Sequence, residues 1–402
     1  MRISARVFAL CLALSISACS SASKNDSLPS AFQPGAQPPQ FTIAARYKPL
    51  YAFKGGLDGA NPWGGLAFHA GYFYGTTNAG GNNGGGTIFV ISPAGKERVL
   101  HSFGNGTDYG DGKGPQAGLI AYNGALYGTT SYGGAHLGGT AFAASFKGKE
   151  LFLHSFWNSG GSTGDGAFPQ AGVAVYGGLL FGTTSTGGAS DGGTIFSISQ
   201  SGKERVAHSF GVTNDGREPW ANLVVYKGAL YGTTSGAGAN YGGTVFSFSA
   251  SGTVSTMHSF GSGSDGWGPR GGLVVYRGTF YGTTYQGGAY HLGTVYSVSP
   301  AGKERVLHGF GNGSDGSSPW GNLVVYKNAL YGTTQLGGTN GGGTIFVITP
   351  SGKERVLHNF GLSAGTGDGA NPLAGLVVYR TTLFGTTSGG GDGGGTIFSL
   401  TP

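Results

Sequence analysis

The tetrapeptide (Tyr/Phe)-Gly-Thr-Thr recurs along this chain of 402 residues at intervals of 50 to 54 residues. Its glycine stands at positions 75, 128, 182, 232, 282, 332 and 385. A repeat of this period is one supersecondary unit, which cannot bury its apolar face alone and becomes stable only against neighbouring copies. The chain must therefore fold as seven packed units of about fifty residues each.

Each unit contains four segments of strand length that are rich in β-branched and aromatic residues. In the sixth unit these segments cover residues 322–326, 329–334, 344–349 and 354–360. The links between them are short, and in the second unit the first link is Asn-Gly at 123–124, which is typical of a two-residue hairpin. Each unit is therefore expected to form one antiparallel sheet of four strands.

The third segment of a unit is apolar at consecutive positions, as in Ile345, Phe346 and Val347 of the sixth unit. Such a strand cannot leave one face in water, so both faces of every sheet must be covered. Seven sheets packed face to face around an axis meet this requirement. We therefore predict an all-β, seven-bladed β-propeller with four antiparallel strands per blade over residues 41–402.

The order of the segments at the two chain ends predicts how the ring closes. Residues 47–53 align with the fourth segment of a unit, whereas the chain ends at Pro402, just after a third segment. An N-terminal strand that completes the last blade would join both ends and leave no open edge. The alternative, an open solenoid, needs atypical capping repeats, and the sequence contains none.

Residues 1–18 have the layout of a signal peptide, because Arg2 and Arg6 precede an apolar run over 7–16 and two small residues. The Ile-Ser-Ala-Cys tetrad that ends at Cys19 resembles the lipobox of bacterial lipoproteins. This resemblance implies that the peptide before Cys19 is removed and that the cysteine carries a lipid. The alternative is an ordinary signal peptide in which the cysteine is incidental.

Residues 19–40 are rich in Ser, Pro, Ala and Gln without apolar periodicity, so we expect a flexible tether. Position 20 is Ser, and not the Asp that retains lipoproteins of enteric-type bacteria in the inner membrane. We therefore expect a lipid-anchored monomer in the bacterial cell envelope, at the outer membrane or cell surface. The net charge of +6 is too small and too scattered to indicate nucleic-acid binding.

The repeating pattern carries a family resemblance. The unit GLVVYxGxLYGTTxxGGxxxGGTIFxIxPxGKERVLHSFGxGxDGxxP, found over residues 41–402, resembles the Gloeo/Verruco (GloVer) tandem repeat of bacterial surface proteins and, more distantly, kelch propellers. It departs from kelch in having Gly-Thr-Thr in place of a Gly-Gly doublet. The resemblance implies a propeller fold and an exposed location, and it implies no particular activity.

An Asp-Gly-x-x-Pro motif precedes the first strand of every unit, with its carboxylate at Asp58, Asp111, Asp165, Asp215, Asp265, Asp315 and Asp368. One Ca²⁺ site needs several oxygens around a single point, and carboxylates of different blades lie too far apart for that. We instead expect each Asp to accept hydrogen bonds from its own turn, where the Gly supplies a positive φ and the Pro begins the next inner strand.

Six histidines occupy one equivalent position in the fourth segment, which we align with Ala52 in the seventh unit: His101, His154, His208, His258, His308 and His358. Because a zinc site needs several ligands at one point, we interpret these residues as hydrogen-bonding groups between strands or blades. No metal, cofactor or catalytic residue is expected. The glycine-rich loops precede strands and not helices, so they do not indicate a phosphate-binding loop.

The residues that differ between units are the candidates for binding. Trp63, Trp220 and Trp320 follow the Pro of the Asp-Gly-x-x-Pro motif, and Trp267 and Arg270 lie in the fifth unit. The corresponding post-proline positions elsewhere are Gln116, Gln170 and Leu373. Alternating strand directions place these loops and the glycine-rich loops on one face. Exposed aromatic rings beside Gln and Arg would suit sugar rings or an extended peptide. In the alternative interpretation the tryptophans are wedged between blades.

We therefore expect a non-enzymatic, lipid-anchored extracytoplasmic propeller that binds a glycan or an envelope protein through one loop face. Two alternatives remain open at this point. One is a structural scaffold in envelope assembly, which a large apolar patch on the outer rim would favour. The other is a hydrolase or lyase acting on polysaccharide, since propellers host such chemistry on their loops.

Overall fold

The computed structural model describes residues 44–105, 110–157, 164–212, 214–311, 314–361 and 367–402. The predicted signal peptide (1–18), the lipidation site Cys19 and the tether (19–40) lie outside these residues. In the described ranges, no helix has the length and hydropathy needed to cross a membrane. The only helical element found there is the short 3-10 turn η1 (Gly56–Asp58).

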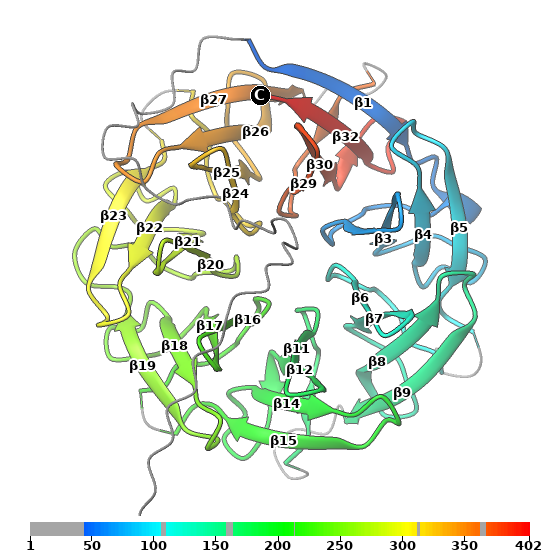
Figure 1. The fold of residues 1–402 in the computed structure, drawn as a ribbon, viewed down its shortest axis with the longest axis horizontal. Helices are drawn as coiled ribbons and strands as arrows, with labels where there is room; N and C mark the ends of the chain where they lie inside the picture. The colour runs from blue at the N-terminus through cyan, green and yellow to red at the C-terminus, as the bar shows by residue number, and fades with distance from the viewer. Residues whose placement is uncertain (1–43, 106–109, 158–163, 213, 312–313, 362–366) are drawn as a thin grey trace, which may run out of the picture. The chain divides into compact units, whose positions relative to one another are not determined.

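Seven four-stranded antiparallel sheets are arranged around an axis as the blades of a propeller, which confirms the predicted fold (Figure 1). In blades one to six the strands follow chain order from the axis to the rim. The innermost strands are β2 (Ala67–His69), β6 (Ile120–Tyr122), β11 (Ala174–Tyr176), β16 (Val224–Tyr226), β20 (Val274–Tyr276), β24 (Val324–Tyr326) and β29 (Val377–Tyr379). The second strands carry the Gly-Thr-Thr motif and are β3 (Tyr72–Thr77), β7 (Ala125–Thr130), β12 (Leu179–Thr184), β17 (Ala229–Thr234), β21 (Thr279–Thr284), β25 (Ala329–Thr334) and β30 (Thr382–Thr387).

The third strands are the most deeply buried, as their apolar runs predict. They are β4 (Thr87–Ile91), β8 (Leu137–Ser145), β14 (Thr194–Ile198), β18 (Thr244–Phe248), β22 (Thr294–Val298), β26 (Gly341–Ile348) and β32 (Thr396–Thr401). The outermost strands are β5 (Glu97–Ser102), β9 (Glu150–Trp157), β15 (Glu204–Ser209), β19 (Val254–Ser259), β23 (Glu304–Gly309), β27 (Glu354–Gly361) and β1 (Arg46–Ala52).

The N-terminal strand closes the ring. Strand β1 pairs antiparallel with β32, so that Tyr47 lies opposite Leu400 and Ala52 opposite Thr396. The seventh blade therefore combines its three C-terminal strands with one strand from the other end of the chain, as predicted (Figure 1).

The core lies between the blades. At every interface, a Phe at the end of one outermost strand meets an aromatic ring on the third strand of the next blade, with ring centroids 4.8 to 5.2 Å apart. The seven pairs are Phe53–Phe89, Phe103–Phe142, Phe156–Phe196, Phe210–Phe246, Phe260–Tyr296, Phe310–Phe346 and Phe360–Phe398. Edge-on and tilted contacts at these distances are favourable beyond the burial of the rings themselves.

The Gly-Thr-Thr motif is explained by this packing. A Cβ on Gly75 would lie 2.5 Å from Cζ of Phe89, so only glycine lets the ring of the third strand cross the second. The hydroxyl of Thr77, the second threonine, lies 2.8 Å from that of Thr87 and accepts a bond from the Thr87 N–H. The motif is thus a requirement of the blade and carries no chemistry of its own.

Candidate functional site

The loop before the first strand and the loop after the second strand of each unit lie at the same end of the ring. They pair directly, through β10 (Gly166–Ala167) with β13 (Thr186–Gly187) and through β28 (Gly369–Ala370) with β31 (Gly389–Gly390). The other five units replace these strands by single bridges, Ala60–Ala79, Lys113–Tyr132, Arg217–Gly236, Trp267–Gln286 and Ser317–Leu336. We call this end of the ring the loop face.

The repeated Asp residues tie these loops to the outermost strands. In the sixth unit the Asp315 carboxylate accepts a hydrogen bond from the Gly311 N–H at 3.0 Å and contacts His308 Nε2 at 2.8 Å. Each of the other five histidines meets the Asp of its own loop in the same way. In the seventh blade Tyr51 donates to Asp58 at 2.6 Å. The residue equivalent to the histidines is therefore Tyr51, and the assignment of Ala52 to that position was wrong. Tyr51 lies opposite Ile397 as His101 lies opposite Ile88, and Tyr51-Ala52-Phe53 aligns without a gap with His101-Ser102-Phe103.

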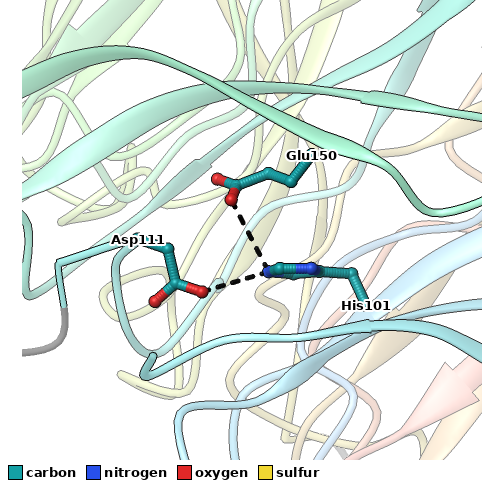
Figure 2. Close-up of side chains that lie close together, drawn as sticks. All are labelled: His101, Asp111 and Glu150. Carbon is teal, nitrogen blue, oxygen red and sulfur yellow. Dashed lines mark hydrogen bonds and ion pairs between the residues drawn. The ribbon is translucent and has the colours of Figure 1, made fainter. Parts of the chain in front are cut away.

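A Glu from the next blade approaches several of these pairs. His101 Nε2 lies 3.2 Å from Asp111 Oδ2 and 3.8 Å from Glu150 Oε2, and Glu150 stands at the start of β9 (Figure 2). The ligand atoms of this cluster lie within 4.8 Å of one another, and so do those of His154, Asp165 and Glu204. Imidazole nitrogen and carboxylate oxygen at this spacing are donors that could hold a divalent cation.

Five glutamates occupy this inter-blade position, namely Glu97, Glu150, Glu204, Glu304 and Glu354. Burial, aided by the charge of a neighbouring Asp, raises the pKa of each of them to about 7. One carboxylate oxygen of each is buried without a hydrogen-bond partner among the described residues. Val254 takes this position in the fourth blade, and Tyr47 takes it in the seventh, where its ring stacks on His358 with centroids 3.7 Å apart.

The sequence reasoning did not find these clusters, because it compared equivalent residues and not neighbouring units. The available signal was the Lys-Glu pair that opens the fourth segment in five units. In the second unit the Glu of this pair, Glu150, approaches His101 at the end of the outermost strand of the preceding blade.

On the loop face, the post-proline residues of all seven units line one cavity of ≈ 570 Å³ around the axis. These residues are Trp63, Gln116, Gln170, Trp220, Arg270, Trp320 and Leu373. Four of the five predicted binding residues are thus brought together. Trp267 is not among the lining residues; its side chain is 44% exposed, and its backbone pairs with Gln286.

The repeated motif holds this cavity in place. In six units, the hydroxyl of the first Thr of Gly-Thr-Thr donates to a backbone carbonyl beside the post-proline residue of the next unit, as Thr76 does to Ala117 at 3.0 Å. The lining residues therefore stand on a rigid frame that the repeats supply. Rigid support of this kind is what a binding site needs to hold its geometry.

Arg270 occupies an aromatic cage in the cavity wall. Its guanidinium carbon lies 4.7 Å from the ring centroid of Trp220, 4.3 Å from that of Tyr285 and 4.2 Å from that of Trp320. Trp220 and Trp320, from units four and six, also meet edge-on, with their centroids 5.9 Å apart across this unit-five arginine. Arg270, Trp220 and Trp320 are all partly buried. The tryptophans therefore surround a cation, an arrangement that the sequence reasoning did not anticipate.

The polar groups of the cavity are incompletely paired. Burial lowers the pKa of Arg270, which stays charged all the same because arginine remains protonated in proteins. The ion pairs found among the described residues all involve histidine, so none of them includes Arg270. In the same part of the chain, Trp220 Nε1 and Gln170 Oε1 are buried without a hydrogen-bond partner. The described lining residues include no Asp, Glu, His, Cys, Ser or Lys.

A family model for the Gloeobacter/Verrucomicrobia repeat matches this sequence three times, over residues 40–177, 99–277 and 228–402. The chain belongs to this family. The resemblance to the Gloeo/Verruco repeat is thereby confirmed, and the three matches together span the propeller. No curated protein matches the chain.

Among solved structures, a streptogramin B lyase is similar to this member of the family with a TM-score of 0.59 and 12% sequence identity, covering 89% of this chain and 97% of its own. Virginiamycin B lyase from Staphylococcus aureus gives a TM-score of 0.57 at 12% identity, covering 89% of this chain and 99% of its own. At this level of identity the likeness establishes the fold and nothing about activity.

Proposed function

We propose that this protein is a non-enzymatic binding protein of the bacterial cell envelope, which takes a glycan or a segment of an envelope protein into the cavity of its loop face. The observation that carries the proposal is the convergence of Trp63, Trp220, Arg270 and Trp320 on one cavity. Its volume, ≈ 570 Å³, falls in the range typical of small-molecule sites. Aromatic rings beside amide groups suit ligands that have both apolar faces and hydroxyls.

The anchor belongs to the same proposal. A lipid on Cys19 would hold the protein on the outer membrane or cell surface, and residues 19–40 would tether a monomeric propeller to it. The support for this part is the sequence pattern of residues 1–40. An extended tether would let the loop face reach ligands outside the membrane.

A hydrolase or lyase acting on polysaccharide is the competing function, and the two lyases of similar fold make it worth testing. Such reactions need a proton donor or acceptor within hydrogen-bonding reach of the substrate. The described residues that line the cavity offer no carboxylate, imidazole or thiol. This absence of acid–base groups favours binding over catalysis.

A scaffold in envelope assembly would need an apolar patch of several hundred Å² on the outer rim. On the outermost strand β9, Leu151, Phe152 and Trp157 are 60%, 43% and 43% exposed. Three side chains are too little surface for a stable interface, so we place this function behind ligand binding.

A glycan array probed with the full-length protein in detergent tests the proposal. Wild type should retain a subset of glycans, and Trp320→Ala should lose them, because truncating an aromatic anchor typically weakens binding by about thirtyfold or more. The exposed Trp267, which does not line the cavity, provides the matched control as Trp267→Ala. If the two variants lose binding equally, the cavity is not the site.

A further inference from the structure

Arg270 is the one charged side chain among the described residues that line the cavity. Three aromatic rings cover its guanidinium at 4.2 to 4.7 Å, and no carboxylate lies within ion-pair distance in the described structure. The exposed carboxylate of Glu218 acts on its charge only from beyond that distance. Cation–π contacts stabilise the charge. The guanidinium also has five N–H donors, and an aromatic ring is a much weaker acceptor for them than an oxygen atom.

A partly buried charge without an acceptor is unfavourable, and it becomes favourable when an anion supplies the missing hydrogen bonds. The planar fork of a guanidinium matches a carboxylate in a bidentate pair. The cage also fixes the orientation of Arg270, so little side-chain entropy is lost when such a ligand binds. The site is therefore organised for an anionic group.

The amide side chains of the wall describe the rest of the ligand. Gln116 and Gln170 both line the cavity. An amide group can donate to a hydroxyl and accept from one, so these residues suit a ligand that carries hydroxyl groups. Trp63 brings an indole ring from the first unit to the same cavity. A carboxylate, hydroxyl groups and an apolar ring face occur together in the acidic sugars.

We infer that the cavity selects an anionic saccharide of the uronic acid class, whose carboxylate pairs with Arg270 and whose hydroxyls meet the side-chain amides of Gln116 and Gln170. This inference rests on the proposed binding function and narrows its ligand to one chemical class. The predicted order of preference is a uronate oligomer over the same oligomer with its carboxylates esterified. Neutral oligosaccharides of equal length rank with the ester.

Titration calorimetry with full-length protein in detergent tests the inference, with oligogalacturonate and its methyl ester as probes. The two ligands differ in the charge of their carboxyl groups and in one methyl group per esterified residue, and a neutral oligosaccharide of equal length controls for the methyl group. The comparison needs no protein variant. We expect the acid to bind at least tenfold more tightly than the ester, because hydrogen bonds to charged groups are the stronger class. The advantage of the acid should shrink as salt is added.

Two arginine variants assign the effect to a residue. Arg270→Gln should reduce the affinity for the acid at least tenfold and leave the affinity for the ester within about threefold. Arg217→Gln removes an exposed charge from the same loop face and should leave both affinities unchanged within twofold. Melting temperatures of both variants establish whether they are folded. If a variant is unfolded, the comparison of acid with ester on the wild-type protein still tests the inference.

Each outcome separates the inference from the proposed function. Equal binding of acid and ester, or an acid preference that survives Arg270→Gln, overturns the inference and leaves saccharide binding in place. Binding of neither probe, together with an empty glycan array, overturns both. Equal loss in Arg217→Gln and Arg270→Gln shows that net charge on the loop face, and not the caged guanidinium, attracts the anion.

Discussion

Replacing Glu150 by Gln is expected to stabilise this propeller above pH 7 and to leave its stability unchanged near pH 4.5. Burial raises the pKa of Glu150 to about 7 in the folded protein, against an ordinary value of 4.5. The folded state therefore binds a proton more tightly than the unfolded state does. Between these two pH values the free energy of unfolding falls as the pH rises, because the folded state must give up that proton.

The magnitude follows from the same two pKa values. A difference between 4.5 and about 7 corresponds to at most about 3 kcal/mol for one carboxyl group. The Glu150 side chain is not fully enclosed, so solvent screening reduces this value, and we expect about 1 kcal/mol. A neutral Gln has no charge to desolvate, so Glu150→Gln should lack this loss of stability. The five inter-blade glutamates lie at separate interfaces, and their effects should add to about 5 kcal/mol.

Urea unfolding followed by tryptophan fluorescence, at intervals from pH 4.5 to pH 8, measures the effect. The quantity of interest is the difference in unfolding free energy between variant and wild type at each pH, because the contributions of groups remote from Glu150 are common to both proteins and cancel. Glu218 is the one glutamate of the chain outside the inter-blade position, and it is exposed on the loop face. Glu218→Gln is therefore the matched control. Glu150→Gln with the same pH slope as wild type would refute the reasoning. So would a variant that is equally destabilised at every pH, since that would mean that the carboxylate is a required partner of His101.

Three further predictions concern the anchor, the loops and the clusters. Cys19→Ala should abolish labelling by palmitate and leave the precursor unprocessed; a labelled variant, or an unlabelled wild type, would exclude the lipoprotein interpretation. Asp315→Ala should destabilise the fold by about 2 kcal/mol, because it leaves the Gly311 N–H and His308 unpaired. It should leave the affinity for glycans unchanged. If the variant instead lost binding without losing stability, the repeated carboxylates would be the binding site. Removing divalent cations with EDTA should leave the melting temperature unchanged, since the carboxylate of Asp111 is already hydrogen-bonded to backbone and imidazole; a clear fall would show that the clusters of Figure 2 hold a cation.

The fold could be predicted from the sequence because one motif recurs seven times at nearly equal intervals, and because the chain starts and stops in different phases of the unit. Those two facts determine the number of blades and the pairing of β1 with β32, without any knowledge of individual contacts. The assignment of Ala52 to the histidine position was wrong, because Tyr51 makes the bond to Asp58. The sequence contained the correction, since the Phe of every fourth segment aligns Tyr51-Ala52-Phe53 with His101-Ser102-Phe103.

The site was only half predictable, for a geometric reason. A position that is the same in every unit serves the blade, and the post-proline position, which varies, lies on the axis where all seven copies meet. Variation within the repeat therefore pointed to Trp63, Trp220, Arg270 and Trp320. It also pointed to Trp267, which varies equally but lies outside the cavity lining.

Contacts between units depend on the curvature of the ring. The spacing of motifs along the sequence does not reveal that curvature. Trp220 and Trp320 are one hundred residues apart in the sequence, yet they close on Arg270 because the post-proline segments of units four, five and six converge at the axis. Glu150 reaches His101 for the corresponding reason at the blade interface, where each outermost strand faces the loop of the preceding blade. Function in such a ring is therefore encoded in how differing residues of adjacent repeats combine, and comparing each unit with its successor is the way to find it in the sequence.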